Sequence, residues 1–129
     1  MAPRNLESLR TATRVLVAVF GLTTALYVFD LANTGWQMTA TEITIPAGAP
    51  PGRKHRHPGF VIGYVPEGQY SFAVNDRPAA VFNAGQMFFE SFDAPGEVHS
   101  SSGNASATQP CRFLAIVFTK KGDPITIPG

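Results

Sequence analysis

The residues with the clearest chemistry are three histidines, the only ones in the chain. His55 and His57 stand two apart in the stretch Lys54-His55-Arg56-His57-Pro58, and His99 follows far downstream. Residues two apart in an extended chain point to the same face, so the first two imidazoles are expected to face together. Proline disfavours a helical conformation at the preceding residue, which favours an extended His57. The pattern predicts half of a metal site on one strand, with His99 as the third ligand.

The elements expected to position these histidines are strands. The chain has 11 prolines, 12 glycines and 10 phenylalanines, and its apolar runs are mostly short. Residues 60–65 and 111–119 are the strongest strand patterns, and turn-forming residues such as Pro66-Glu67-Gly68 separate such runs. About seven or eight strands at intervals of roughly 8–12 residues predict an all-β sandwich or barrel over residues 41–129. Residues 100–110 are expected to form a polar loop, and residues 124–128 an edge strand.

The N-terminal segment has a different pattern. Arg4, Arg10 and Arg14 precede a run without charge over residues 15–29. Basic residues followed by an apolar run are typical of a signal peptide or an uncleaved signal anchor, and the lack of a small-residue cleavage site favours the anchor. We therefore expect a hydrophobic helix within residues 1–32, with the membrane segment at 15–32, and a linker at 33–40. The positive-inside rule then places the domain outside the cytoplasm, membrane-anchored or secreted. A core helix of a soluble domain is the alternative.

Charge and cysteine content narrow the functions further. The chain has 10 basic and 9 acidic side chains, and no basic cluster is interleaved with aromatic residues, so nucleic acid is not expected as a partner. The single cysteine, Cys111, excludes an internal disulfide. Because it begins an apolar run, we expect a buried and unreactive thiol.

The histidine stretch also fits the first of two sequence motifs. The chain resembles the cupin superfamily, in particular its small single-domain members of the conserved-barrel type 2. Their first motif has His-x-His, then a glutamate, then a glycine; His55, His57 and Gly68 match it here. The glutamate position falls on Val61 or Ile62, so the fourth ligand implied by the family is absent from its usual place.

The second cupin motif begins with glycine and runs through a Pro/Gly turn to histidine and asparagine. Gly85, Pro95-Gly96, His99 and Asn104 correspond, although the segment before the turn is about three residues longer than usual. The resemblance covers residues 41 to about 122. It implies a cupin double-stranded jelly-roll β-barrel with a metal ion in its mouth, held by His55, His57 and His99. Small cupins often form dimers, which leaves a homodimer open.

A carboxylate from elsewhere is the expected substitute for the missing glutamate. Glu90, Asp93 and Glu97 all lie in or beside the lengthened segment before His99. We take Glu90 as the fourth ligand and Glu97 as its substitute. Imidazole ligands suit several divalent ions, so Fe, Zn, Mn and Ni are not distinguished. Neutral histidines leave the charge of the ion uncompensated, which favours an anionic or chelating small molecule.

Three functions remain open at this point. The first is a metal-binding protein that captures a small molecule without turnover. The second is a metal-dependent enzyme of the dioxygenase type that acts on a small phenolic or diketone-like substrate. The third is a barrel with an empty site. The fold alone cannot choose among them, since one fold hosts many activities.

Overall fold

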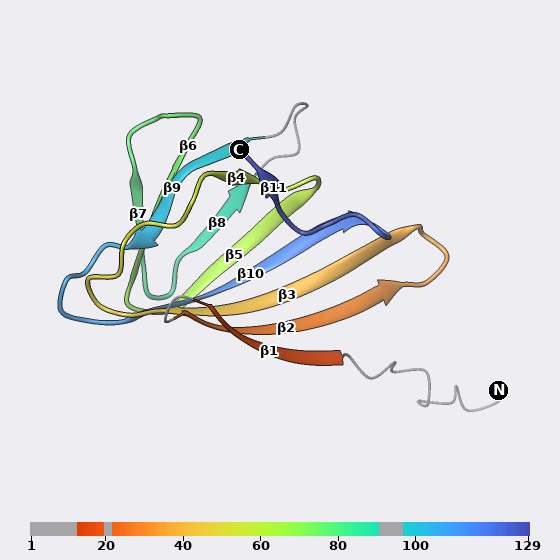
Figure 1. Cartoon of the computed structure of the whole chain (residues 1–129), viewed down its shortest axis with the longest axis horizontal. Coiled ribbons are helices and arrows are strands. Elements are labelled where there is room, and N and C mark those ends of the chain that lie inside the picture. Colours follow the sequence, from red (N-terminus) through yellow and green to blue (C-terminus); the bar gives the residue numbers. More distant parts are fainter. Residues whose placement is uncertain (1–12, 20–21, 91–96) are drawn as a thin grey trace.

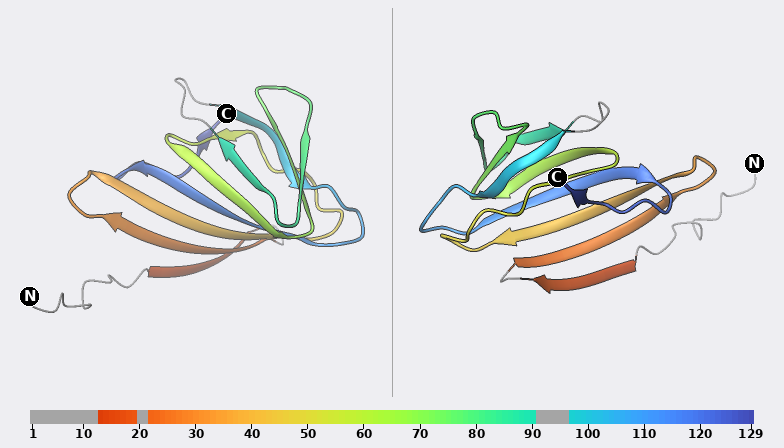
Figure 2. Two further views of the ribbon diagram at one scale, coloured as in Figure 1. Left: turned by 180° about the vertical axis from the view of Figure 1, so that it is seen from behind. Right: turned by 45° about the horizontal axis from the view of Figure 1, so that its top comes forward.

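The computed structural model describes residues 13–19, 22–90 and 97–129, and every element in them is a strand (Figure 1). The strands form two antiparallel sheets. The smaller sheet lies over the part of the larger one formed by its later strands, while β1 and β2 extend beyond it (Figures 1 and 2). The all-β, two-sheet architecture predicted from the sequence is confirmed.

The larger sheet has six strands in the order β1-β2-β3-β10-β5-β8. Their bounds are β1 Thr13–Val19, β2 Leu22–Leu31, β3 Trp36–Ile45, β10 Cys111–Lys120, β5 Phe60–Glu67 and β8 Met87–Glu90. The strand β10 is central and pairs with β3 along ten residues, from Cys111↔Ile45 to Lys120↔Trp36. Its alternate residues, Cys111, Phe113 and Val117 among them, are buried on the face toward the other sheet, as the period of a strand requires.

The smaller sheet has five strands in the order β11-β4-β9-β6-β7. Their bounds are β11 Ile127–Pro128, β4 His55–Arg56, β9 Val98–Asn104, β6 Gln69–Val74 and β7 Ala80–Asn83. The edge strand expected near residues 124–128 is present as β11. The strand β9 was not predicted, because its serines, glycine and asparagine have low intrinsic strand propensity. Pairing with β6 on one side and β4 on the other supplies the hydrogen bonds that the composition does not suggest.

The N-terminal helix is not found in the described residues, where residues 13–19 and 22–31 form strands instead. Leu22–Leu31 pairs with β3 along nine residues, from Thr23↔Thr44 to Leu31↔Trp36. An apolar run rich in valine, threonine and aromatic residues suits a strand as well as a helix, and periodicity cannot separate the two. The linker expected at 33–40 is a turn followed by the start of β3 at Trp36. Residues 1–12, with Arg4 and Arg10, lie outside the described residues.

Within the described residues, no helix has the length and apolar character needed to span a bilayer. The C-terminal end of β2 is instead tied to the loop after β10, where Lys121 Nζ lies 2.7 Å from Asp30 Oδ2.

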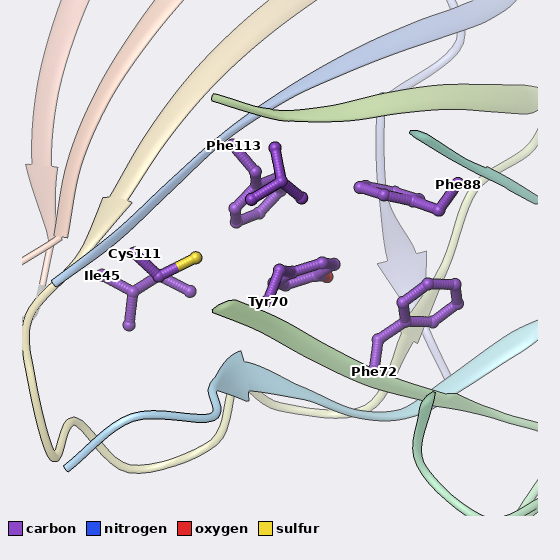
Figure 3. Close-up of a cluster of buried hydrophobic side chains, with 7 residues drawn as sticks. Ile45, Tyr70, Phe72, Phe88, Cys111 and Phe113 are labelled. Atoms are coloured by element: carbon purple, nitrogen blue, oxygen red, sulfur yellow. The ribbon is translucent and has the colours of Figure 1, made fainter. Parts of the chain in front are cut away.

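The hydrophobic core fills the space between the two sheets (Figure 3). It is formed by Ile45, Val65, Tyr70, Phe72, Phe88, Cys111 and Phe113. The ring of Tyr70 stacks on Phe113 with centroids 4.1 Å apart, and Phe72 packs against Phe88 at 5.2 Å. Cys111 is fully buried, and burial raises the pKa of its thiol, so the expected unreactive cysteine is found.

Candidate metal site

The three histidines converge, as predicted, at one end of the space between the sheets. His55 on β4 is the direct cross-strand neighbour of His99 on β9, and His57 follows β4 immediately. The ring centroid of His55 lies 4.6 Å from that of His99 and 5.1 Å from that of His57. One ligand nitrogen from each ring lies within 4.8 Å of the other two, so the three are positioned to hold a metal ion. A strand of only two residues suffices, because sheet pairing brings the distant histidine to the others.

Backbone carbonyl groups orient two of the three rings. The Nδ1 of His55 lies 2.9 Å from the carbonyl oxygen of Arg53, and the Nδ1 of His57 contacts that of Ile125. A carbonyl oxygen only accepts, so each Nδ1 carries the proton as donor. Each Nε2 then has a free lone pair. This is the arrangement that fixes the tautomer and direction of metal-binding histidines.

His99 is held differently, by packing. It is 3% exposed, and its ring stacks on Phe72 with centroids 5.5 Å apart and planes 26° apart. Among the described residues, Nδ1 of His99 has no hydrogen-bond partner, and Nε2 has only the carboxylate of Glu90 beside it. A buried polar group without a partner is costly, and a metal ion is one group that would satisfy a bare ring nitrogen. The residues present therefore fit a bound metal.

Glu90 places a carboxylate against the same cluster. Its Oε2 lies 2.6 Å from Nε2 of His99 and 3.6 Å from Nε2 of His57, and the residue is 4% exposed. The shorter contact has the length of an ion pair, and both of its atoms are of a kind that can bind a metal ion. Of the carboxylates considered, Glu90 is the one that contacts histidines of the cluster. Neither Glu90 nor Glu97 belongs to the group of three histidine ligand atoms itself, and Asp93 lies outside the described residues.

Glu90 lies beside the position at which the first motif would place its glutamate. Val61 on β5 is fully buried and pairs directly with Glu90 on β8. Directly opposed residues of antiparallel strands project from the same face with Cβ atoms about 4.5–5.5 Å apart. The Glu90 carboxylate on β8 thus lies near the point on the inner face of the larger sheet where a side chain at position 61 of β5 would lie.

Burial keeps the histidines in the form that binds metals. Desolvation lowers the pKa of His55 below its ordinary value, although the Arg53 carbonyl raises it in part. Desolvation likewise lowers the pKa of His57, against the opposing effect of the Glu90 carboxylate. Both rings are therefore neutral at pH 7 and offer lone pairs rather than protons.

A cavity of about 590 Å³ opens beside the cluster. His55, His57 and Glu90 form part of its wall, with the exposed Arg53 also lining it. The remaining lining is mostly apolar and comes from β3, β10, Phe88 and the loop at residues 49–52. A cavity of this size with a few converging polar groups is typical of small-molecule sites.

The two-sheet fold matches that of solved cupins. The chain has the cupin fold, with three histidines placed to hold a metal ion, as the sequence resemblance implied. A cupin of the RmlC-like type from Shewanella frigidimarina superimposes with a TM-score of 0.63 at 22% identity, covering 85% of this chain and 87% of that one. A cupin-like protein from Thermotoga maritima gives a TM-score of 0.61 at 18% identity, with 83% and 76% covered.

Larger enzymes share the same fold. The oxalate decarboxylase of Lactobacillus farciminis, solved as a formate complex, gives a TM-score of 0.67 at 17% identity. This chain is 89% covered in that match and spans 33% of the decarboxylase. No protein-family model matches the sequence, and no curated protein does. At these identities the likeness establishes the fold alone.

Two contributors to the site were not identified from the sequence. Ile125 acts through its backbone carbonyl, and such a role leaves no trace in the residue type. Phe72 was one of many aromatic residues, and only the pairing of β6 with β9 brings it to His99. The signal that could have pointed to Ile125 was the proline-containing segment at 124–128. It predicted an edge strand but did not indicate which strand that edge strand joins.

Proposed function

We propose that this protein is a metal-binding cupin that holds a divalent ion through His55, His57 and His99 and takes a small molecule into the adjacent cavity. Glu90 is the proposed fourth ligand. The observation that carries the proposal is the convergence of three imidazoles, two of them oriented by backbone carbonyls. Three histidines used only for packing would not need such orientation.

The residues of the chain have distinct roles in this proposal. His55 and His57 direct their Nε2 lone pairs, while Phe72 fixes the plane of His99. The apolar wall, including Phe88, excludes water from the inner side of the cluster. A divalent ion bound there would supply a positive charge able to bind or polarise an oxygen of the small molecule. Glu90 would offset part of that charge.

Metal analysis of the purified full-length chain tests the proposal. The wild type is loaded with Fe²⁺, Zn²⁺, Mn²⁺ or Ni²⁺, desalted and measured for bound metal. We expect about one bound ion per chain for at least one of the metals. In His55→Ala and in His99→Ala, the affinity for that metal should fall by more than about ten-fold. The control is Lys54→Ala, which removes an exposed side chain next to His55. Lys54 is paired with Asp76, with Nζ and Oδ1 3.4 Å apart. A wild type that binds none of the four metals refutes the proposal and leaves the empty barrel.

Enzymatic turnover is the second candidate, and the cavity beside the cluster favours it. The site has room for a substrate next to the ion, and the fold is shared with oxalate decarboxylases. Dioxygen consumption is measured with the iron-loaded protein and small phenols or acetylacetone. Consumption that depends on both His55 and the added compound supports a dioxygenase-type enzyme. Metal binding without any consumption supports a binding protein.

We also propose an extracytoplasmic location, on the basis of the arginines before the apolar run. Residues 22–31 cannot at once pair with β3 and cross a membrane, so the two arrangements exclude each other. Fractionation of cells that produce the full chain or a form without residues 1–32 separates them. Membrane association of the full chain alone supports an anchor. Equal solubility of both forms refutes it.

A further inference from the structure

The cavity beside the histidines is polar at one end and apolar at the other. The polar end contains His55, His57 and Glu90, with Arg53 at the opening. The opposite end is lined by Ile43 and Ile45 of β3 and Phe113 of β10. This division suggests a ligand with two unlike ends. Binding of such a ligand rests on the proposed metal only for the charge at the polar end.

Strand register gives the direction and length of the apolar part. Glu90 pairs with Val61, and Val61 with Val117, so these three form the row nearest the histidines. The next rows along the same face contain Ala115 with Thr41, then Phe113 with Ile43, and last Ile45. Successive rows are two residues apart, or about 6.7 Å, so three rows extend roughly 20 Å away from Glu90.

Small side chains keep the middle of this path open. Ala115 lines the cavity halfway along it, opposite Thr41 on β3 and Gly63 on β5. The ring of Phe88 lies over Gly63, where an added Cβ would come within 1.9 Å of the ring. The loop at 49–52 forms the wall on the side of the smaller sheet. It is joined to β9 by a hydrogen bond from the Gly52 N–H to the Ser102 carbonyl. No charged side chain among the described lining residues lies in this middle part.

The charges at the polar end favour an anion. A divalent ion, the single carboxylate of Glu90 and the guanidinium of Arg53 together leave a net positive charge there. A cavity of 590 Å³ equals the liquid volume of about 20 water molecules, which admits a ligand of about a dozen non-hydrogen atoms.

We propose that the cavity binds a medium-chain aliphatic carboxylate. Its carboxylate lies at the histidines and Arg53, and its hydrocarbon chain runs past Ala115 toward Ile45. The ligand is an amphipathic acid with about six to ten carbons, since the cavity admits about a dozen non-hydrogen atoms. The chain is apolar because polar groups would lack hydrogen-bond partners in that part of the cavity.

A chain-length series tests the proposal. Acetate, hexanoate and decanoate are titrated by calorimetry into the zinc-loaded full-length protein. Each buried methylene tightens Kd by up to about four-fold, so decanoate is expected to bind at least ten-fold more tightly than hexanoate. Equal affinities of decanoate and hexanoate refute the apolar path. Binding of 1-decanol as tight as that of decanoate refutes the assignment of a carboxylate head.

Variants on β10 locate the chain. Ala115→Phe fills the path and is expected to abolish the gain from hexanoate to decanoate while leaving metal content unchanged. Ile116→Phe, one residue along on the opposite face, is the matched control and should keep the gain. If Ala115→Phe does not fold, Ala115→Leu provides a smaller obstruction. An unchanged gain in a folded Ala115 variant overturns the proposed path.

The outcome separates this inference from the proposed function. The series is repeated on the metal-free protein, where Arg53 remains and the apolar gain is still expected. A protein that binds zinc but has no chain-length dependence in either form refutes the carboxylate and keeps the metal site. A protein that binds no zinc but has the dependence refutes the metal and keeps the apolar path.

Discussion

The carboxylate of Glu90 gives the sharpest test of the site. Its Oε2 lies 2.6 Å and 3.6 Å from the Nε2 atoms of His99 and His57, so it borders any ion that those two rings share. A carboxylate and a divalent ion about 4 Å apart attract by about 8 kcal/mol at an effective dielectric constant near 20. Removing the buried charge also relieves its desolvation, which offsets part of this attraction. We expect Glu90→Gln to weaken divalent metal binding by about 10–100-fold.

The assay is competition with a chromophoric chelator, using zinc and manganese. Glu97→Gln is the matched control, since it removes the same charge seven residues along the chain and is expected to change affinity less than about three-fold. If Glu90→Gln binds the metal as tightly as the wild type and Glu97→Gln binds it more weakly, Glu90 is not the fourth ligand and Glu97 is favoured instead.

Exchanging residues across the β5–β8 pair extends this test. In the double variant Val61→Glu with Glu90→Val, the carboxylate moves to the directly opposed position on the same face. We expect this double variant to regain at least half of the binding free energy lost in Glu90→Val alone. Failure to regain any, in a folded protein, would contradict the view that the neighbouring strand has taken over the role.

Three further outcomes follow from the structure. The pKa values of His55 and His57 are lowered in the folded chain, so the unfolded chain binds more protons below about pH 6.5. The metal-free protein should therefore lose stability as pH falls from about 7 to 5 in urea unfolding, and His55→Gln should flatten this slope. Gly68 has φ +77°, and an added Cβ would lie 2.3 Å from the Pro110 carbonyl oxygen, so Gly68→Ala should cost about 1–3 kcal/mol. Gly85→Ala, at φ +88° with open space within the described residues, should cost less. Saturating metal at about 100 times Kd should raise Tm by roughly 10 °C in calorimetry, and chelation should reverse the rise.

Local patterns predicted most of the barrel because its strands satisfy the period of two. The apolar runs at 60–65, 69–74 and 111–119 all became strands, and the two-residue spacing of His55 and His57 was enough to place both rings at one site. Polar β9 was missed, because its structure depends on two neighbours rather than on its own residues.

The rest needed tertiary information. Choosing among three carboxylates required the register of β5 against β8, which no spacing within the chain encodes. The segment at 15–32 was expected to be helical, but its apolar character fits a helix, a membrane segment and a buried strand equally well. Pairing with β3 decided the outcome in the described residues.

The backbone contact between Ile125 and His57 bears on the order in which the protein assembles. The two residues are 68 positions apart, and β11 must reach β4 before His57 is oriented. Closing so long a loop is entropically costly and comes late in folding. During synthesis, His55 and His57 leave the ribosome well before the segment that orients them. An ion that met the chain before β11 had paired with β4 would find His57 without the carbonyl group that orients it, so the proposed site would be complete only after that pairing.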